Sequence, residues 1–264
     1  MQGDYYSYYA ANNYLAHHGV LGMKWGQHIF GKTKSHSANR VSKKDRRSDP
    51  IQPRSFSTND TSITVRKKDG ETYLPKGTTV TRTAESGTGD LSNYRKTYVS
   101  YTKKDADTWE EYLGNEYVKR GTLTDVITYK TTKDLKILQG KEAGKIFDDM
   151  LKDTKVKDIV KHDIKDYYKK VPEQATRKAK AKTSADMGSR MLAVSKYYKS
   201  AQIYLDRIQE AGYDAVYDVH GSNLADNPLI ILNPGKNLSK EQTTRYTKAS
   251  EEYLKSIGFD WMFD

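Results

Sequence analysis

One guanidinium and two hydroxyls are the side chains of this sequence best suited to hold a phosphate-bearing ligand. Ser100 and Thr102 alternate with Tyr101 in the run KTYVSYT, so both hydroxyls face the same side of an expected strand. The strand leads into an expected helix, whose first turn favours anions. Arg82 lies upstream in TTVTRTA, and arginine is suited to bidentate phosphate contact. The alternative is that these are ordinary polar residues on half-exposed strands.

A second group of polar residues lies at the end of the expected strand YDAVYDV. Tyr213, Asp214, Asp218 and His220 gather there, and an Asp–His or paired-carboxylate arrangement could do acid–base chemistry. The alternative is a loop with an Asx-type turn before Gly221, and the pattern favours this second interpretation.

Two motifs near the start of the chain do not predict a site. Residues 26–33, GQHIFGKT, match the P-loop expression G-x-x-x-x-G-K-[ST], but the polar, basic segment that follows cannot form the buried helix that a phosphate cradle needs. His17, His18 and His28 have no carboxylate at useful spacing, and the chain has no cysteine. We therefore predict neither a nucleotide loop nor a metal site.

The composition predicts a well-solvated protein. The net charge of +11 over 264 residues indicates either a lysine-rich surface or an anionic partner, such as nucleic acid or a phosphorylated cofactor. Hydrophobic residues make up 36% of the chain, and no apolar run approaches the ~18 residues of a membrane helix. The first residues lack the basic start and apolar centre of a signal peptide. We expect no membrane association and no disulfides.

The chain divides into three expected parts. Residues 1–30 form a docking-type element that is rich in tyrosine and ends in YLAHHGVLGMKWG. Residues 31–60 are basic, serine-rich and interrupted by prolines, which predicts a flexible linker. Residues 61–264 are expected to form the folded domain.

The periodicity of the domain predicts short strands on either side of a helical block. Strands are expected in SITVRKK and ETYLP, which form a hairpin, and then at 78–84, 96–102, 125–131, 213–219 and 227–234. Helices are expected at 104–119, 133–152, 155–170, 184–211 and 239–257, the last opened by a capping-box spacing of Ser239 and Gln242. Strands and helices do not alternate, so the expected class is α+β, with a short-stranded mixed or antiparallel β core, a helical block and a mobile N-terminal arm.

The stretch HHGVLGMKWG, residues 17–26, resembles a short element that recurs near the ends of proteins from phages and prophages of Gram-positive bacteria. This resemblance implies a phage origin. The side chains of Leu21, Met23 and Trp25 would be buried only against a partner or the main domain, which is typical of a docking peptide.

The order of the candidate residues resembles the mono-ADP-ribosyltransferase fold of the arginine–serine–glutamate type. A strand with an arginine is followed by an aromatic–x–Ser–x–Thr strand that runs into a helix, and the late strand reads LIILNPG. The resemblance implies an ADP-ribosyltransferase-like β core and NAD as the cofactor. Arg82 would bind the NAD phosphates, and Ser100 and Thr102 would shape the nicotinamide pocket.

The third sequence element of that family differs in this chain. Its catalytic Glu-x-Glu precedes the late strand, where this chain has Asp226-Asn227-Pro228. Both glutamates are missing, and a proline stands in place of the second. An oxocarbenium-like transition state needs a nearby carboxylate, and the resemblance leaves Asp226 or Asp218 to supply it.

Three hypotheses about function follow. The first is a phage-encoded transferase-like protein that moves ADP-ribose from NAD to a host or phage protein, in the host cytoplasm or the virion. The second is a non-catalytic, virion-associated interaction protein that uses the same fold and docks through residues 1–30. The third is a nucleic-acid binder that acts through its basic arm, with affinity that falls steeply with salt. The oligomeric state is left open.

Overall fold

The structure is a computed structural model that describes residues 66–68, 70–176, 180–218 and 225–263. The predicted docking element, the predicted basic linker and the P-loop-like and histidine motifs therefore lie outside the described residues. His220 also lies outside them.

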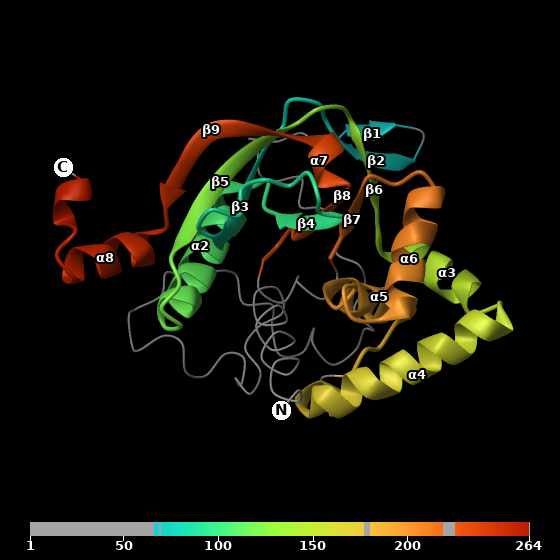
Figure 1. Cartoon of the computed structure of the whole chain (residues 1–264). Helices are drawn as coiled ribbons and strands as arrows, with labels where there is room; N and C mark the ends of the chain where they lie inside the picture. Colours follow the sequence, from blue (N-terminus) through green and yellow to red (C-terminus); the bar gives the residue numbers. More distant parts are fainter. Residues whose placement is uncertain (1–65, 69, 177–179, 219–224, 264) are drawn as a thin grey trace, which may run out of the picture.

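Two β-sheets form the centre of the molecule (Figure 1). The larger has the strand order β1-β2-β6-β7-β8-β4 and is mixed, because β6 and β7 run parallel while the other neighbours run antiparallel. Its strands are β1 (Arg66–Lys68), β2 (Glu71–Leu74), β6 (Leu135–Leu138), β7 (Ala215–Tyr217), β8 (Leu229–Leu232) and β4 (Lys96–Val99). The smaller sheet is antiparallel and has the order β3-β5-β9. Its strands are β3 (Thr79–Glu85), β5 (Thr124–Thr131) and β9 (Leu238–Tyr246).

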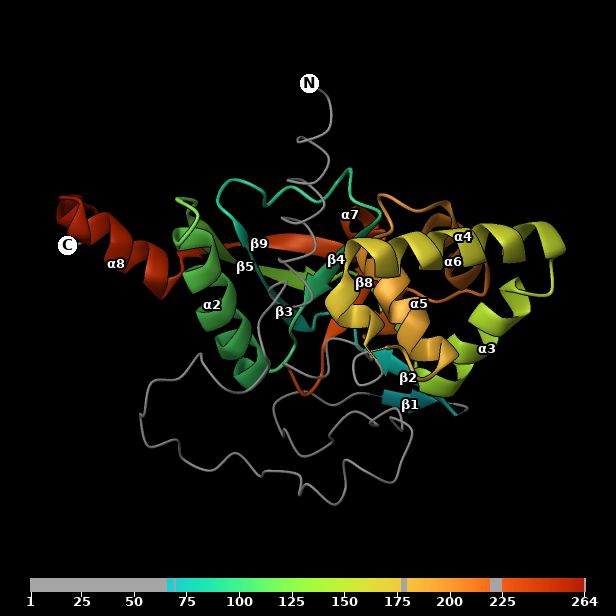
Figure 2. The same ribbon diagram turned by 90° about the horizontal axis from the view of Figure 1, so that it is seen from below.

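Seven α-helices and two short 3₁₀ helices surround the sheets within the described residues. They are α2 (Lys103–Val118), α3 (Gly140–Met150), α4 (Thr154–Lys170), η1 (Pro172–Ala175), α5 (Ser184–Ala193), α6 (Lys199–Glu210), α7 (Pro234–Asn237), α8 (Lys248–Ser256) and η3 (Asp260–Met262). Helices α3 to α6 form a block on one side, and α2 and α8 lie at the opposite end (Figures 1 and 2). The predicted α+β class, with a mixed and antiparallel β core and a helical block, is confirmed.

The hydrophobic core lies mainly between the larger sheet and the helical block. The strand β8, LIIL, is fully buried, as expected for a short continuous apolar run. Helix α6 buries Tyr204, Leu205 and Ile208 on one face, the stripe that period 3.6 predicts. Phe147 of α3 packs its ring edge-on against Tyr204, with 5.2 Å between centroids. These contacts hold the helical block against β8 and its neighbours.

Two helix predictions in the helical block are wrong in part. The segment 133–152 contains the strand β6 and only then the helix α3, because Leu135 and Ile137 alternate with a half-exposed lysine and pair with β2 and β7. The segment 184–211 is two helices, α5 and α6, separated at 194–198. Its apolar periodicity continues across the break because both helices bury a face in the same core.

The predicted helix at 239–257 is also wrong in its first half. Residues 238–246 form β9, which pairs along the length of β5 from Leu238 to Tyr246. Pairing at a sheet edge outweighs a local capping pattern here. The helix begins later, and Thr247 is its N-cap, with Oγ1 accepting a hydrogen bond from the Ser250 amide at 3.3 Å.

Among the described residues, no helix combines the length and apolar character needed to cross a membrane.

Candidate functional site

A cleft opens where the two sheets meet. Thr81 of β3 and Ser100, which follows β4, form an isolated antiparallel bridge in which each backbone amide donates to the other carbonyl oxygen, at 2.7 and 2.8 Å. The cleft has a volume of about 160 Å³, and Arg82 and Ser100 both line it. Its walls also include aromatic and apolar residues of the β3–β4 loop, β4, α2 and the segment before β8: Tyr94, Tyr98, Trp109, Leu113, Tyr117 and Pro228. The structure therefore brings two of the predicted site residues together.

The size of the cleft limits what it can enclose. Ligand pockets for whole drug-sized molecules span roughly 300–1,000 Å³, so a cleft of about 160 Å³ encloses one ring-sized part of a larger ligand. The remaining parts of such a ligand would lie along its open rim.

Arg82 is held at the edge of the cleft by neutral groups. Its Nη1 donates to the Thr88 carbonyl oxygen at 2.7 Å, and its guanidinium carbon lies 5.6 Å from the centre of the Tyr94 ring. Among the described residues, Arg82 makes no ion pair with a carboxylate. A guanidinium has five N–H donors, so donors remain that could meet an anion.

One face of α2 forms the aromatic wall of the cleft. Trp109, Leu113 and Tyr117 recur every four residues and so lie on one side of the helix, and all three line the cleft. Burial raises the pKa of the Tyr117 hydroxyl, and the nearby Glu85 carboxylate raises it further. Aromatic faces of this kind suit a planar ring.

Thr102 has a different role from the one that the resemblance implied. It is not among the residues that line the cleft. Its hydroxyl oxygen accepts a hydrogen bond from the Asp105 amide at 3.1 Å, which makes it the N-cap of α2. Thr102 therefore starts the helix that carries the aromatic wall, and Ser100 alone supplies a hydroxyl to the cleft.

Asp218 lies in the same cross-strand row as Ser100. Strand β8 pairs with β4 on one side and β7 on the other. Leu229 of β8 is paired with Val99 of β4 and with Tyr217 of β7, so the residue before it, Pro228, lies between Ser100 and Asp218. The Asp218 amide donates a hydrogen bond to the Pro228 carbonyl oxygen at 3.0 Å. Two strand spacings separate the Cα atoms of Ser100 and Asp218 by roughly 10 Å. The Asp218 side chain is buried and does not itself line the cleft.

The charge of Asp218 acts on two residues of β4. Lys96 and Tyr98 alternate with Thr97 and so share the face of Ser100. The Lys96 ammonium lies 4.8 Å from the centre of the Tyr98 ring. Burial lowers the pKa of Lys96 to about 8, and the Asp218 carboxylate opposes this shift. Burial also raises the pKa of Tyr98 well above its usual value, and the Asp218 charge adds to that shift. The buried Asp218 thus belongs to a polar cluster with the half-buried Lys96 and Tyr98 beside the cleft.

Asp226 points to a different partner. Its carboxylate pairs with the Lys104 ammonium, and the side chain is 47% exposed. It does not line the cleft. The backbone amides of Asp226 and Asn227 donate to the two carboxylate oxygens of Asp105, at 2.9 and 3.0 Å. The buried Asp105 therefore fixes the segment before β8 against the start of α2.

The sequence prediction missed two parts of the cleft wall. Tyr94 and Glu85 come from the loop after β3 and from its last residue, and both line the cleft. No signal in the local sequence identified them, because Tyr94 reaches the cleft only through the β3–β4 loop and Glu85 lines it only because β3 packs beside α2. Trp109 and Tyr117 of α2 also line the cleft and lie two turns apart on one face of the helix.

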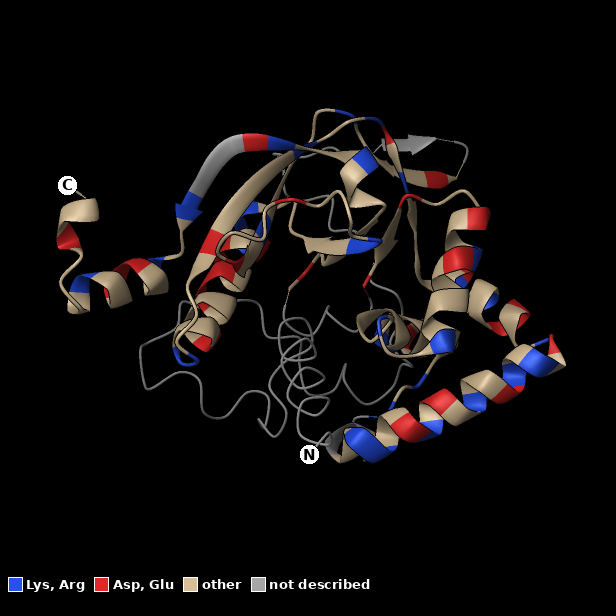
Figure 3. Cartoon of the chain, in the orientation of Figure 1, with Lys and Arg blue, Asp and Glu red and all other residues tan. Residues whose placement is uncertain are grey.

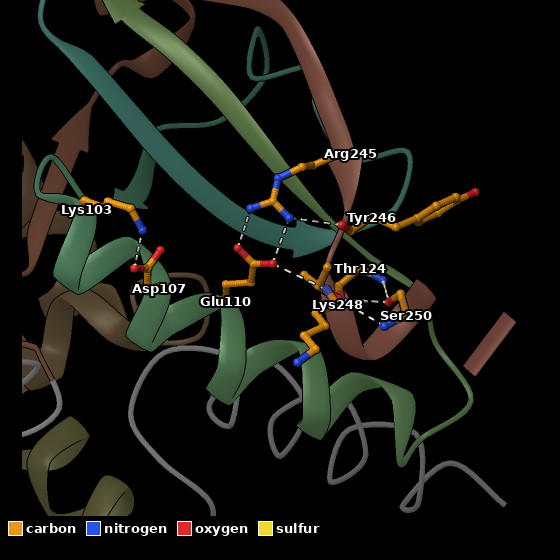
Figure 4. A network of polar contacts seen from close by, with 9 residues as sticks. Lys103, Asp107, Glu110, Thr124, Arg245, Tyr246, Lys248 and Ser250 are labelled. Carbon is orange, nitrogen blue, oxygen red and sulfur yellow. Dashed lines mark hydrogen bonds and ion pairs between the residues drawn. The ribbon is translucent and has the colours of Figure 1, made fainter. Parts of the chain in front are cut away.

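A separate polar network locks α2 to the far end of the smaller sheet (Figure 4). Glu110 accepts two hydrogen bonds from the Arg245 guanidinium, at 2.9 and 2.7 Å. The buried Thr124 hydroxyl lies 2.6 Å from that of Thr247 and 3.0 Å from that of Ser250. The Glu110–Arg245 pair fixes α2, and thereby the aromatic wall, against β9, and the hydroxyl cluster holds the start of α8 against β5.

Within the part of the chain that the structure describes, no group of three or more histidine, aspartate or glutamate side chains is arranged to hold a metal ion. Arg82, Ser100 and the aromatic wall suit a different kind of ligand, one that joins a phosphate to a planar ring.

Comparison with known proteins gives one match. The model of a family of unknown function (DUF7211) matches residues 9–36, a range that includes the HHGVLGMKWG stretch. No curated protein matches the chain significantly, and no solved structure does.

Proposed function

We propose that this chain is a phage-encoded, NAD-binding protein of the mono-ADP-ribosyltransferase type that modifies a host or phage protein. The observation that supports it most is the shared cleft of Arg82 and Ser100, which the Thr81–Ser100 bridge creates. Arg82 would bind the phosphates of NAD. Ser100 and the aromatic wall of α2 would bind the nicotinamide ring. A single ring of this size matches the cleft volume of about 160 Å³.

The reaction would break the glycosidic bond between the ribose C1′ and the nicotinamide nitrogen. The bonding electrons leave with nicotinamide, positive charge develops on the ribose, and a side chain of the acceptor protein attacks C1′ and loses a proton. A carboxylate near the ribose stabilises that charge. We assign this role to Asp218 rather than Asp226, because Asp218 lies in the row of Ser100 and Pro228 whereas Asp226 is paired with Lys104.

Release of nicotinamide from NAD tests this function. The wild-type chain is expected to release nicotinamide, and Asp218→Asn to slow the release by roughly 10-fold, because the buried carboxylate would act on the ribose through its charge across roughly 10 Å and not by direct contact. Asp226→Asn is the matched control and should stay within about twofold of the wild type, because an exposed ion pair contributes little. Normal release by Asp218→Asn together with loss of release in Asp226→Asn would reverse the assignment.

A second candidate is a non-catalytic, virion-associated protein that uses the cleft only for binding. Pro228 supports it, because this residue lines the cleft at the position of the missing glutamate and has no side-chain acceptor. The match of residues 9–36 to a family shared with other proteins also fits a docking element. Deletion of residues 1–30 should then abolish co-sedimentation with particles while the domain stays folded, and unchanged incorporation would exclude this role.

A further inference from the structure

The outer side of helix α4 carries a row of lysines. Lysines recur along the length of this helix (Figure 3), and four of them are spaced every four residues, so they are neighbours on the helix surface. All four are exposed. At 1.5 Å per residue, the row is roughly 18 Å long. This α4 lysine row consists of Lys157, Lys161, Lys165 and Lys169.

The apolar side chains of α4 face the core of the protein. Val160 and Tyr167 are buried, and the half-buried Val156 and Ile164 pack against the same core. None of the large apolar side chains of α4 is exposed. The side of the helix that carries the α4 lysine row is therefore polar and turned to solvent.

The acidic residues of α4 do little to compensate the row. Asp163 is buried, and its carboxylate accepts a hydrogen bond from a backbone amide of α6 at 2.9 Å. Asp166 accepts one from the Tyr198 hydroxyl at 3.0 Å. Asp158 alone pairs with a lysine of the row, Lys161, at 3.7 Å, and both side chains of this pair are exposed, so it contributes little. The other three lysines of the row make no ion pair with any described residue.

The spacing of these lysines opposes the stability of the helix. Like charges four residues apart repel one another, and the row contains three such pairs in succession: Lys157–Lys161, Lys161–Lys165 and Lys165–Lys169. A helix that is only solvated usually alternates acids and lysines at this spacing. Residues 66–264 have 36 basic and 30 acidic residues, a net charge of +6, and α4 alone carries +3 of it, from six lysines and three aspartates. Positive charge is thus concentrated on one exposed line, which indicates an anionic partner.

The shape and chemistry of the row indicate which anionic partner it fits. A lysine ammonium binds phosphate as a point charge, and duplex DNA is a stiff polyanion that presents phosphates at regular intervals. A helix that binds a membrane surface carries a large exposed apolar face, which α4 lacks. The helix also has no exposed aromatic side chain on which a base could stack. Contact would therefore be with the backbone and would not read the sequence.

We propose that the α4 lysine row binds the phosphate backbone of duplex DNA, independently of base sequence. Each lysine that meets a phosphate releases condensed counterions, so the affinity falls as salt rises. No residue of α4 lines the cleft, so this site is separate from the proposed NAD site and does not depend on it. It is also distinct from the predicted basic arm at residues 31–60.

Binding of the full chain to a short fluorescent DNA duplex, measured over a range of salt concentrations, tests the proposal. The row variant replaces all four lysines by glutamine. Its slope of log affinity against log salt should be less steep than that of the wild type by about 3 to 4, because each phosphate contact contributes about 0.9. The control variant makes the same change of charge at four exposed lysines outside α4 and should alter the slope by less than about 1. Its substitutions are Lys76→Gln, Lys141→Gln, Lys236→Gln and Lys248→Gln.

Urea unfolding and vesicle binding complete the test. The row variant should have a urea midpoint equal to or above that of the wild type, because it has lost the repulsion between like charges. Weaker DNA binding by this variant then cannot be attributed to unfolding. An unchanged salt slope in the row variant, or an equal change in the control variant, would overturn the proposal. So would binding that depends on the row with phosphatidylserine vesicles but not with DNA, since the partner would then be a membrane surface.

Discussion

Thr81 and Ser100 exchange two backbone hydrogen bonds and so join the three-stranded sheet to the six-stranded sheet. Because of this single bridge, the strand that bears Arg82 runs beside the end of the strand that delivers Ser100. The cleft exists at this junction, and its wall is formed by α2, whose N-cap Thr102 lies two residues after Ser100. The candidate site is therefore a consequence of how the two sheets meet.

Removing the Ser100 hydroxyl tests its assigned contact with the ligand. Ser100→Ala should lower NAD affinity by roughly three- to tenfold, the effect of one neutral hydrogen bond, measured by titration calorimetry. Ser92→Ala, in the exposed loop before β4, is the control and should bind NAD as the wild type does. Equal affinities of the Ser100→Ala and wild-type chains would exclude Ser100 from the site.

Thr102 should affect stability and not binding. Thr102→Ala removes the N-cap of α2 and should lower the free energy of unfolding by about 1 kcal/mol, measured in urea. Thr102→Ser keeps the capping oxygen and should restore most of the loss. A loss of NAD affinity without a loss of stability would instead support the role that the family resemblance implied.

Asp105 should be the most costly single carboxylate to change near the cleft. Asp105→Asn weakens two charge-assisted hydrogen bonds to the amides of residues 226 and 227 and should destabilise the fold by about 2–3 kcal/mol. Asp107→Asn, on the exposed side of the same helix, is the control and should change stability by less than about 0.5 kcal/mol. Similar urea midpoints for the two variants would contradict the account of Asp105.

Lys96 should make stability increase at alkaline pH. Burial lowers the pKa of Lys96 to about 8 from the ordinary value of 10.5. Between these values the unfolded chain holds the proton and the folded chain does not, so the destabilisation caused by burying this lysine decreases as pH rises through that window.

The comparison of the wild type with Lys96→Met isolates this contribution. The stability advantage of Lys96→Met, measured by urea unfolding, should be largest near pH 7 and shrink as pH rises from 8 to 10. An advantage that is constant or grows with pH would show that Lys96 is not held in a desolvated position.

Much of the fold could be predicted from local patterns. The strands β3, β4, β5 and β8 and the helices α2 and α4 follow from alternation, apolar runs and period 3.6, close to their predicted bounds. The errors arose where a local pattern competed with sheet pairing. The Ser239–Gln242 spacing suggested a helix start, yet those residues lie in β9, because the backbone groups of β5 needed a partner strand.

The candidate site was only partly predictable for a similar reason. The chain order identified Arg82 and Ser100, both of which line the cleft, and alternation predicted that the Thr102 side chain shares the face of Ser100. What alternation could not show is that the Thr102 hydroxyl is used by the Asp105 amide, or that Asp226 turns toward Lys104 while Asp218 joins the row of Ser100. These choices depend on which strands are neighbours, which is a property of the whole fold.

Titration calorimetry of NAD against the wild type, Arg82→Ala and Arg82→Lys tests the central claim most directly. We expect the wild type to bind NAD and Arg82→Ala to bind it roughly 10- to 100-fold more weakly, which is the effect of losing charge-assisted hydrogen bonds. Arg82→Lys should restore binding only in part, because an ammonium cannot form the bidentate contact. Arg207→Ala, at an exposed position on α6, controls for net charge and should bind normally. Absence of heat from the wild type at millimolar NAD, or unchanged affinity in Arg82→Ala, would contradict the account.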